Sequence, residues 1–106
     1  MEKTFHHIGI PTAQKQPNEI HLADVKLFIT DATKSEHRIE WLRFEPGSPM
    51  PELLKTTAHV AYVVEDLEKA LAGKKVIAPP WAPMEGLRVA FIDDGGAPVE
   101  FLQFAK

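Results

Sequence analysis

The sequence predicts an α+β fold made of two related halves, and three observations point to this class. First, a histidine precedes an apolar, strand-like stretch twice, at His7 and again at His59. Second, two later segments, 39–44 and 99–104, share the pattern apolar-Glu-aromatic-Leu-x-Phe at the end of a hairpin. Third, the second half contains a short helical pattern between strand patterns, whereas the first half contains no convincing one. A repeat of this kind constrains the architecture more strongly than local propensities do.

The length and composition favour one globular domain. A chain of 106 residues, of which 44% are hydrophobic and 25% are charged, is expected to build one core rather than two. We therefore expect a single domain over 1–106, with a first module at about 4–45, a linker at 46–56 and a second module at about 57–106.

The charge and the residue usage exclude several functional classes. A net charge of −3 is not the basic footprint of a protein that binds nucleic acid or an anionic membrane. The absence of cysteine from the sequence excludes disulfides, thiolate zinc sites and cysteine nucleophiles. No run approaches the ~18 apolar residues of a membrane span, and the first residues contain no apolar leader. We expect a cytoplasmic protein without a nucleic-acid or membrane partner.

The elements of the first half follow from its apolar runs and its prolines. An apolar strand is expected over 7–12, and the strands of a hairpin are expected over 26–31 and 39–44. The stretch 13–24 contains a proline and no helical stripe, so we expect a loop or one turn of helix there and a shortened first module. The linker begins with a proline-rich stretch, and a turn of helix is expected within it at 52–55.

The second half has the pattern βαβββ. Apolar residues recur at helical spacing over 67–72, Asp66 precedes them as a candidate N-cap, and Gly73 follows as a stop. We expect prolines only in loops or at the boundaries of strands. The remaining expected elements are a strand at 57–64, a strand at 75–78, a proline-rich loop at 79–86 and a hairpin whose strands flank 94–96.

Side-chain alternation places two histidines and two glutamates on one surface. Because successive residues of a strand face opposite sides, His7 and His59 each point away from the apolar face of their strand. Glu40 and Glu100 each share a face with a leucine and a phenylalanine. Four such groups in one concavity require compensation, which a divalent cation would supply. Imidazole nitrogen together with carboxylate oxygen suits Zn, Mn, Fe, Co or Ni, and fewer than six protein ligands leave positions for substrate oxygens.

These motifs resemble those of the vicinal oxygen chelate superfamily, which includes glyoxalase I, methylmalonyl-CoA epimerase, extradiol dioxygenases and bleomycin resistance proteins. The matching motifs are His-Ile-Gly-Ile at 7, Ile-Glu-Trp-Leu at 39, His-Val-Ala-Tyr at 59 and Pro-Val-Glu-Phe-Leu at 98. The resemblance spans nearly the whole chain and implies paired βαβββ modules that form a curved mixed sheet around a cavity. It also implies that each module gives one histidine and one glutamate to a divalent transition metal, namely His7, Glu40, His59 and Glu100.

The activity implied by this resemblance is that of a metal-dependent lyase, isomerase or epimerase of the glyoxalase type. It transfers a proton at a carbon next to a chelated oxygen of a small substrate, and we favour Glu100 over Glu40 as the group that moves the proton. Two alternatives stay open. One is a non-catalytic protein that sequesters a small molecule, as the bleomycin resistance proteins do, and the other is an extradiol-type dioxygenase.

Further residues are candidates for contacts with the substrate. Trp81 and Met84, in the expected proline-rich loop, form a lid over the cavity or anchor the loop to the core. Arg88 binds a substrate carboxylate or phosphate, or else is a solvated charge at a strand edge. His6 faces away from His7 by strand alternation, so we expect it to pack or to be exposed. Because the chain is small and its curved sheet has open edges, we expect a homodimer.

Overall fold

The computed structural model describes residues 2–106, and Met1, which belongs to the expected domain, lies outside the described residues. The α-helices are α1 (Glu52–Thr56) and α2 (Leu67–Leu71). The strands are β1 (Thr4–Pro11), β2 (Ile20–Leu22), β3 (Leu27–Ile29), β4 (Ile39–Phe44), β5 (His59–Val63), β6 (Val76–Met84), β7 (Leu87–Asp94) and β8 (Ala97–Phe104).

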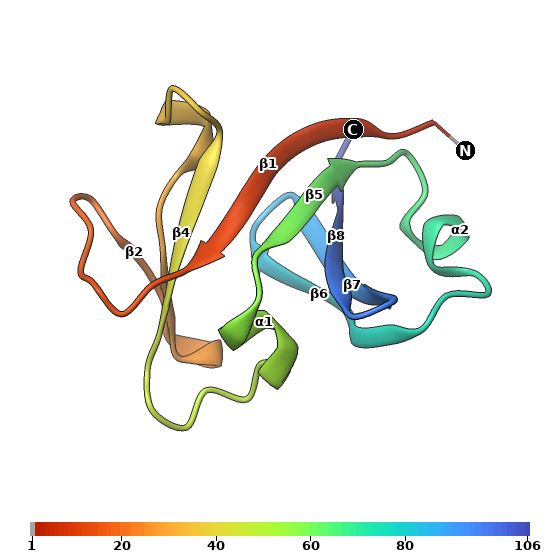
Figure 1. Cartoon of the computed structure of the whole chain (residues 1–106). Helices are drawn as coiled ribbons and strands as arrows, with labels where there is room; N and C mark the ends of the chain where they lie inside the picture. Colours follow the sequence, from red (N-terminus) through yellow and green to blue (C-terminus); the bar gives the residue numbers. More distant parts are fainter. Residues whose placement is uncertain (1) are drawn as a thin grey trace.

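Within residues 2–106, the strands form one mixed sheet in the order β2-β3-β4-β1-β5-β8-β7-β6. The sheet curves until it nearly closes around an axis, and β1 and β5 lie side by side where the two halves of the chain meet (Figure 1). The α+β class and the curved mixed sheet are therefore confirmed. Each half contributes four neighbouring strands, as a duplicated module requires.

The first module has no helix between β1 and β2 in the part of the chain that the structure describes. The connecting residues 12–19 contain Pro17, and Asn18 adopts a left-handed conformation with φ of +59°. Both features turn the chain and oppose a helix. The loop expected over 13–24 is confirmed only as far as residue 19, because the strand β2 occupies Ile20–Leu22. The strands β3 and β4 follow, with short 3₁₀ turns at Ala23–Val25 and Ala32–Lys34.

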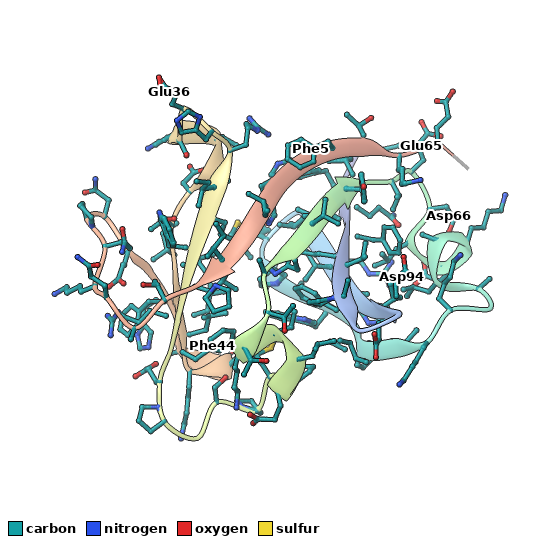
Figure 2. The ribbon with its side chains drawn as sticks, viewed as in Figure 1. Phe5, Glu36, Phe44, Glu65, Asp66 and Asp94 are labelled. Atoms are coloured by element: carbon teal, nitrogen blue, oxygen red, sulfur yellow. The ribbon has the colours of Figure 1, made fainter. Side chains whose placement is uncertain are left out.

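The second module has the expected βαβββ order. The side chain of Asp66 accepts a hydrogen bond of 3.1 Å from the backbone N–H of Lys69, so it caps the start of α2 (Figure 2). Gly73 adopts a φ of +73° just beyond the helix, a left-handed conformation that glycine reaches without strain. The expected cap and the expected stop are both confirmed.

The expectation of a proline-rich loop over 79–86 is wrong for most of its length, because β6 continues through it to Met84. β6 pairs with β7 and forms one edge of the sheet. A proline in an edge strand needs no hydrogen-bonded partner on its open side. The pairing of β6 with β7 also shifts register at three places, which lets the strand accommodate Pro79, Pro80 and Pro83.

Alternate residues of β7 pack into two different apolar clusters on opposite faces of the sheet. Ala90 and Ile92 pack with Leu67 of α2 on the outer face. Val89 and Phe91 belong to the cluster on the inner face, which includes a residue of α1. Because α2 covers the outer face, the inner face is left to line the interior of the curved sheet. No helix in residues 2–106 is long and apolar enough to cross a membrane.

Candidate metal centre

The pairing register brings the four predicted ligands together. β1 and β5 run antiparallel to each other, and each runs parallel to the glutamate-bearing strand of its own module. In both modules the residue two positions after the histidine is small and pairs with the glutamate of that module. The small residue of one module also pairs with the histidine of the other. These pairs are Gly9 with His59, His7 with Ala61, Gly9 with Glu40, and Ala61 with Glu100.

Gly9 leaves room for the imidazole of His59. A Cβ atom at position 9 would lie 2.1 Å from Cε1 and 2.4 Å from Nε2 of that ring, whereas ordinary contact begins at 3.4 Å. Phe91 packs against the same imidazole in a T-shaped arrangement, with the ring centroids 5.1 Å apart. Within the described residues Nδ1 of His59 has no hydrogen-bond partner. The ring is therefore oriented by packing rather than by a hydrogen bond at Nδ1.

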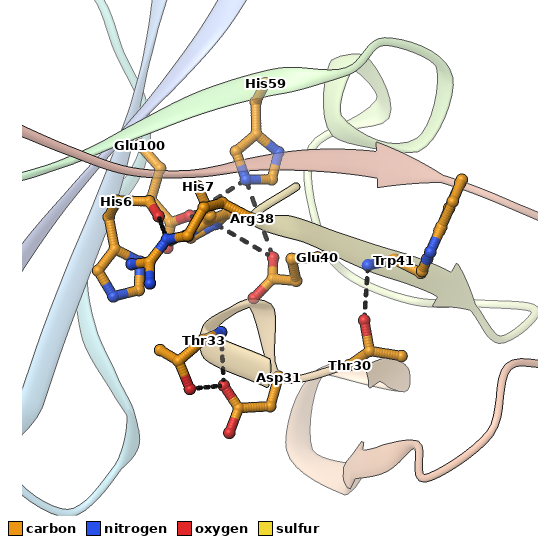
Figure 3. A network of polar contacts seen from close by, with 10 residues as sticks. All are labelled: His6, His7, Thr30, Asp31, Thr33, Arg38, Glu40, Trp41, His59 and Glu100. Atoms are coloured by element: carbon orange, nitrogen blue, oxygen red, sulfur yellow. Dashed lines mark hydrogen bonds and ion pairs between the residues drawn. The ribbon is translucent and has the colours of Figure 1, made fainter. Parts of the chain in front are cut away.

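The four side chains converge on one point (Figure 3). One ligand atom from each of them lies within 4.8 Å of the other three. Oε1 of Glu100 is 3.1 Å from Nε2 of His7 and 3.1 Å from Nε2 of His59. Oε1 of Glu40 is 3.4 Å and 4.0 Å from the same two nitrogens. All four ligands come from one chain, so the cluster is complete without a second copy.

Burial and ion pairing act in opposite directions on the titration of this cluster. Burial lowers the pKa of His7, but pairing with the carboxylates of Glu100 and Glu40 outweighs burial and raises that pKa to about 9. Burial raises the pKa of Glu100, but pairing with His59 and His7 outweighs it and lowers that pKa to about 2. Without a metal, His7 and Glu100 are therefore oppositely charged at neutral pH.

The residues present fit a divalent transition metal. Nε2 of His7 is buried and has no aligned hydrogen-bond partner within residues 2–106, although two carboxylates lie close to it. Atoms that lie about 2.1 Å from a common ion are about 3.0–4.2 Å from one another. The four nitrogen–oxygen distances, 3.1 to 4.0 Å, fall in this range. The cluster can therefore hold a metal ion, with the two carboxylates balancing its charge.

His6 lies on the same side of β1 as His7, which corrects the expectation from strand alternation that it faces away. From Phe5 to His7 the chain advances two residues on β1 but one on β5, so His6 is the extra residue of a β-bulge. The bulge lets His6 line the same cavity as His7, and the two Nδ1 atoms are 2.7 Å apart. Burial, together with the charges of His7 and Arg38, lowers the pKa of His6 and so favours a neutral ring. A His7 that binds metal through Nε2 keeps its proton on Nδ1, and His6 is then the acceptor for that proton.

A cavity of about 280 Å³ opens beside the cluster. Its lining includes both glutamates of the cluster and many apolar side chains from the two modules. Trp81 and Met84, both on β6, line the cavity, and Trp81 also packs against the inner core cluster. Trp81 therefore forms part of the cavity wall and anchors β6 to the core.

Arg88 does not lie in this cavity. Its neighbours on β7, Leu87 and Val89, both line it, so strand alternation turns Arg88 to the opposite face. There its guanidinium pairs with the carboxylate of Glu68 on α2. The structure thus gives Arg88 no place in the candidate site.

Comparison with known proteins supports the fold. No family model matches the chain, and no curated protein matches it. A solved structure, that of the hypothetical protein BH1468 from Bacillus halodurans C-125, matches with a TM-score of 0.72 and 20% identity, over 100% of this chain and 97% of that chain. This likeness shows a shared fold, which is consistent with the superfamily fold that the sequence motifs resemble.

Proposed function

We propose that the protein is a metal-dependent lyase, isomerase or epimerase of the glyoxalase type, within the vicinal oxygen chelate superfamily. The observation that carries this proposal is the convergence of His7, Glu40, His59 and Glu100 beside a cavity. A bound metal supplies Lewis acidity toward two adjacent oxygens of a small substrate, which stabilises the charge that develops when a proton leaves the neighbouring carbon.

The two histidines are suited to holding the metal in a fixed position. His7 and His59 are 2% and 1% exposed, so neither ring can swing into solvent. Their burial also strengthens electrostatic interactions at the centre, because less water is present to screen them. The histidines therefore provide rigid ligands, and the proton transfer falls to the carboxylates.

The contacts of the two carboxylates favour Glu40 as the group that moves the proton. Glu100 lies 3.1 Å from both imidazoles, and its side chain is 8% exposed. Glu40 lies 3.4 Å and 4.0 Å from the same imidazoles, and its side chain is 16% exposed. A general base must reach the substrate proton, which requires a carboxylate that can leave the cluster. These contacts favour Glu40, whereas the sequence favoured Glu100.

Metal content tests the proposed centre. We expect about one transition-metal ion per chain after reconstitution, and its loss in His7→Ala and in His59→Ala. His37→Ala is the matched control, because His37 is highly exposed and pairs with its neighbour Glu36. That variant should keep its metal. A protein that folds but binds no metal would instead favour the sequestering binding protein.

Proton exchange tests the proposed reaction. The probe is 3-hydroxy-2-butanone in D₂O, and NMR follows the loss of the proton on the carbon that bears its hydroxyl group. The metal-loaded protein should accelerate this exchange, and Glu40→Gln should slow it by roughly 10²- to 10⁴-fold. A larger loss in Glu100→Gln at equal metal content would reverse the assignment of the two carboxylates. No exchange by the fully loaded protein would contradict the proposed reaction for this class of compound.

A further inference from the structure

Apolar side chains from both modules form the walls of the cavity. Three of the large hydrophobic residues that line it remain exposed to solvent: Ile20 by 41%, Met84 by 44% and Phe104 by 45%. Exposed apolar surface that gathers around one cavity is typical of a ligand-binding site. A hydrocarbon group in the cavity would remove this surface from water. The lining further includes Leu22 and Leu27 of the first module and Leu87 of the second.

The charged groups of the cavity lining do not favour an anionic ligand group away from the cluster. No lysine or arginine in residues 2–106 lines the cavity. Asp31 does line it, and Oδ1 of its carboxylate accepts hydrogen bonds of 2.9 Å and 2.6 Å from the N–H and the hydroxyl of Thr33 (Figure 3). A phosphate or carboxylate there would meet an acidic side chain and no cationic one apart from the histidines.

The arginines on neighbouring elements do not line the cavity and are engaged by other groups. Arg38 donates a hydrogen bond of 2.8 Å from Nε to the backbone oxygen of His6. Arg43 donates hydrogen bonds of 2.8 Å and 2.7 Å to the two carboxylate oxygens of Glu19, and its guanidinium stacks on Phe28. Arg88 pairs with Glu68 on the outer face of the sheet. An anionic group that lies in the cavity away from the cluster would therefore be desolvated without a cationic side chain to compensate it.

From these observations we infer that the substrate carries an uncharged hydrocarbon substituent next to its two adjacent oxygens. The inference rests on the proposed function, because the two oxygens would bind the metal while the substituent would contact the apolar walls of the cavity. It excludes substrates that place a phosphate or a second carboxylate in the cavity away from the metal cluster, such as bulky anionic conjugates.

Binding of three 2-hydroxy acids to the metal-loaded protein tests this inference. Isothermal titration calorimetry would compare lactate, 2-hydroxyhexanoate and 2-hydroxyadipate after the metal content has been measured. All three present the same pair of oxygens. 2-Hydroxyhexanoate has three more methylene groups than lactate, and each should raise the affinity about fourfold, or about 60-fold in all. 2-Hydroxyadipate replaces the terminal methyl group by a carboxylate, so it should bind at least about tenfold more weakly than 2-hydroxyhexanoate.

A charge placed in the cavity wall provides a stringent control. Met84→Lys introduces a cation at a lining position that is 44% exposed, and it should shift the preference toward 2-hydroxyadipate. Val76→Lys is the matched variant, because Val76 lies on the same strand, is 41% exposed and does not line the cavity. It should keep the preference of the wild-type protein.

The outcomes separate this inference from the proposed function. A protein that binds no metal contradicts the proposed function and this inference with it. A metal-loaded protein that binds 2-hydroxyadipate as tightly as 2-hydroxyhexanoate overturns the inference alone. The same conclusion follows if Met84→Lys and Val76→Lys have the same preference.

Discussion

Replacing Gly9 by alanine should abolish tight metal binding without changing any ligand. The new Cβ atom would lie 2.1 Å from Cε1 of His59, and ordinary contact begins at 3.4 Å, so the imidazole must move by about 1.3 Å. Metal–ligand distances tolerate only about 0.2 Å. His59 is 1% exposed, so its imidazole cannot turn out into solvent without a rearrangement of its neighbours. We therefore expect metal affinity to fall at least about 100-fold, which is the upper end of losses caused by misoriented ligands.

Competition with a chromophoric chelator measures this affinity, and thermal unfolding of the metal-free protein measures the accompanying strain. Overpacking at Gly9 should destabilise the fold by about 1–3 kcal/mol. Gly73→Ala is the control, because Gly73 has a φ of +73° and no atom lies within 4 Å of its added Cβ. It should destabilise by about 1 kcal/mol and leave metal affinity unchanged. Metal affinity in Gly9→Ala equal to that of the wild type would refute the assignment of His59 as a ligand oriented by packing.

Three further predictions concern pH, His6 and assembly. The metal-free protein should lose stability as pH rises from about 6.5 to about 9, because the pKa of His7 is about 9 in the folded state and 6.5 when unperturbed. The stabilisation from the charged His7 is complete below pH 6.5 and is lost as the pH rises through about 9. A free energy of unfolding, measured with denaturant, that stays constant over this pH interval would contradict the ion pairs of His7. His6→Leu should weaken metal affinity about 10- to 100-fold, whereas His6→Asn, whose oxygen can accept the same hydrogen bond, should restore most of it. Equal affinities in the two variants would show that the contact of His6 with His7 does not support the ligand. We expect a homodimer by light scattering, and because one chain provides all four ligands, dissociated monomers should keep their metal. Loss of metal on dilution would show that the partner completes the centre.

The four ligands could be predicted from the sequence because strand alternation and duplication are local properties. The repeat pairs His7 with His59 and Glu40 with Glu100, and the side of the strand that each faces follows from its neighbours. The repeat also carries a signal for the role of Gly9. A small residue follows each histidine at the second position, and it pairs with the histidine of the other module.

Two features could not be predicted, because they depend on how strands pair. Alternation assigned His6 to the wrong side, since a bulge between Phe5 and His7 exists only in the register of β1 against β5. The proline-rich stretch 79–86 has the composition of a loop, but most of it is strand because β6 lies at an edge with one open side. Because this stretch is part of β6 and not a loop, Trp81 and Met84 lie in the cavity wall.

Anomalous diffraction from crystals of the metal-loaded protein would test the central claim most directly. Data collected at the absorption edge of the metal should show one peak per chain, about 2.0–2.2 Å from Nε2 of His7 and of His59 and from carboxylate oxygens of Glu40 and Glu100. A peak at any other position, or no peak in a folded and fully reconstituted protein, would contradict the assignment of these four side chains as one metal centre.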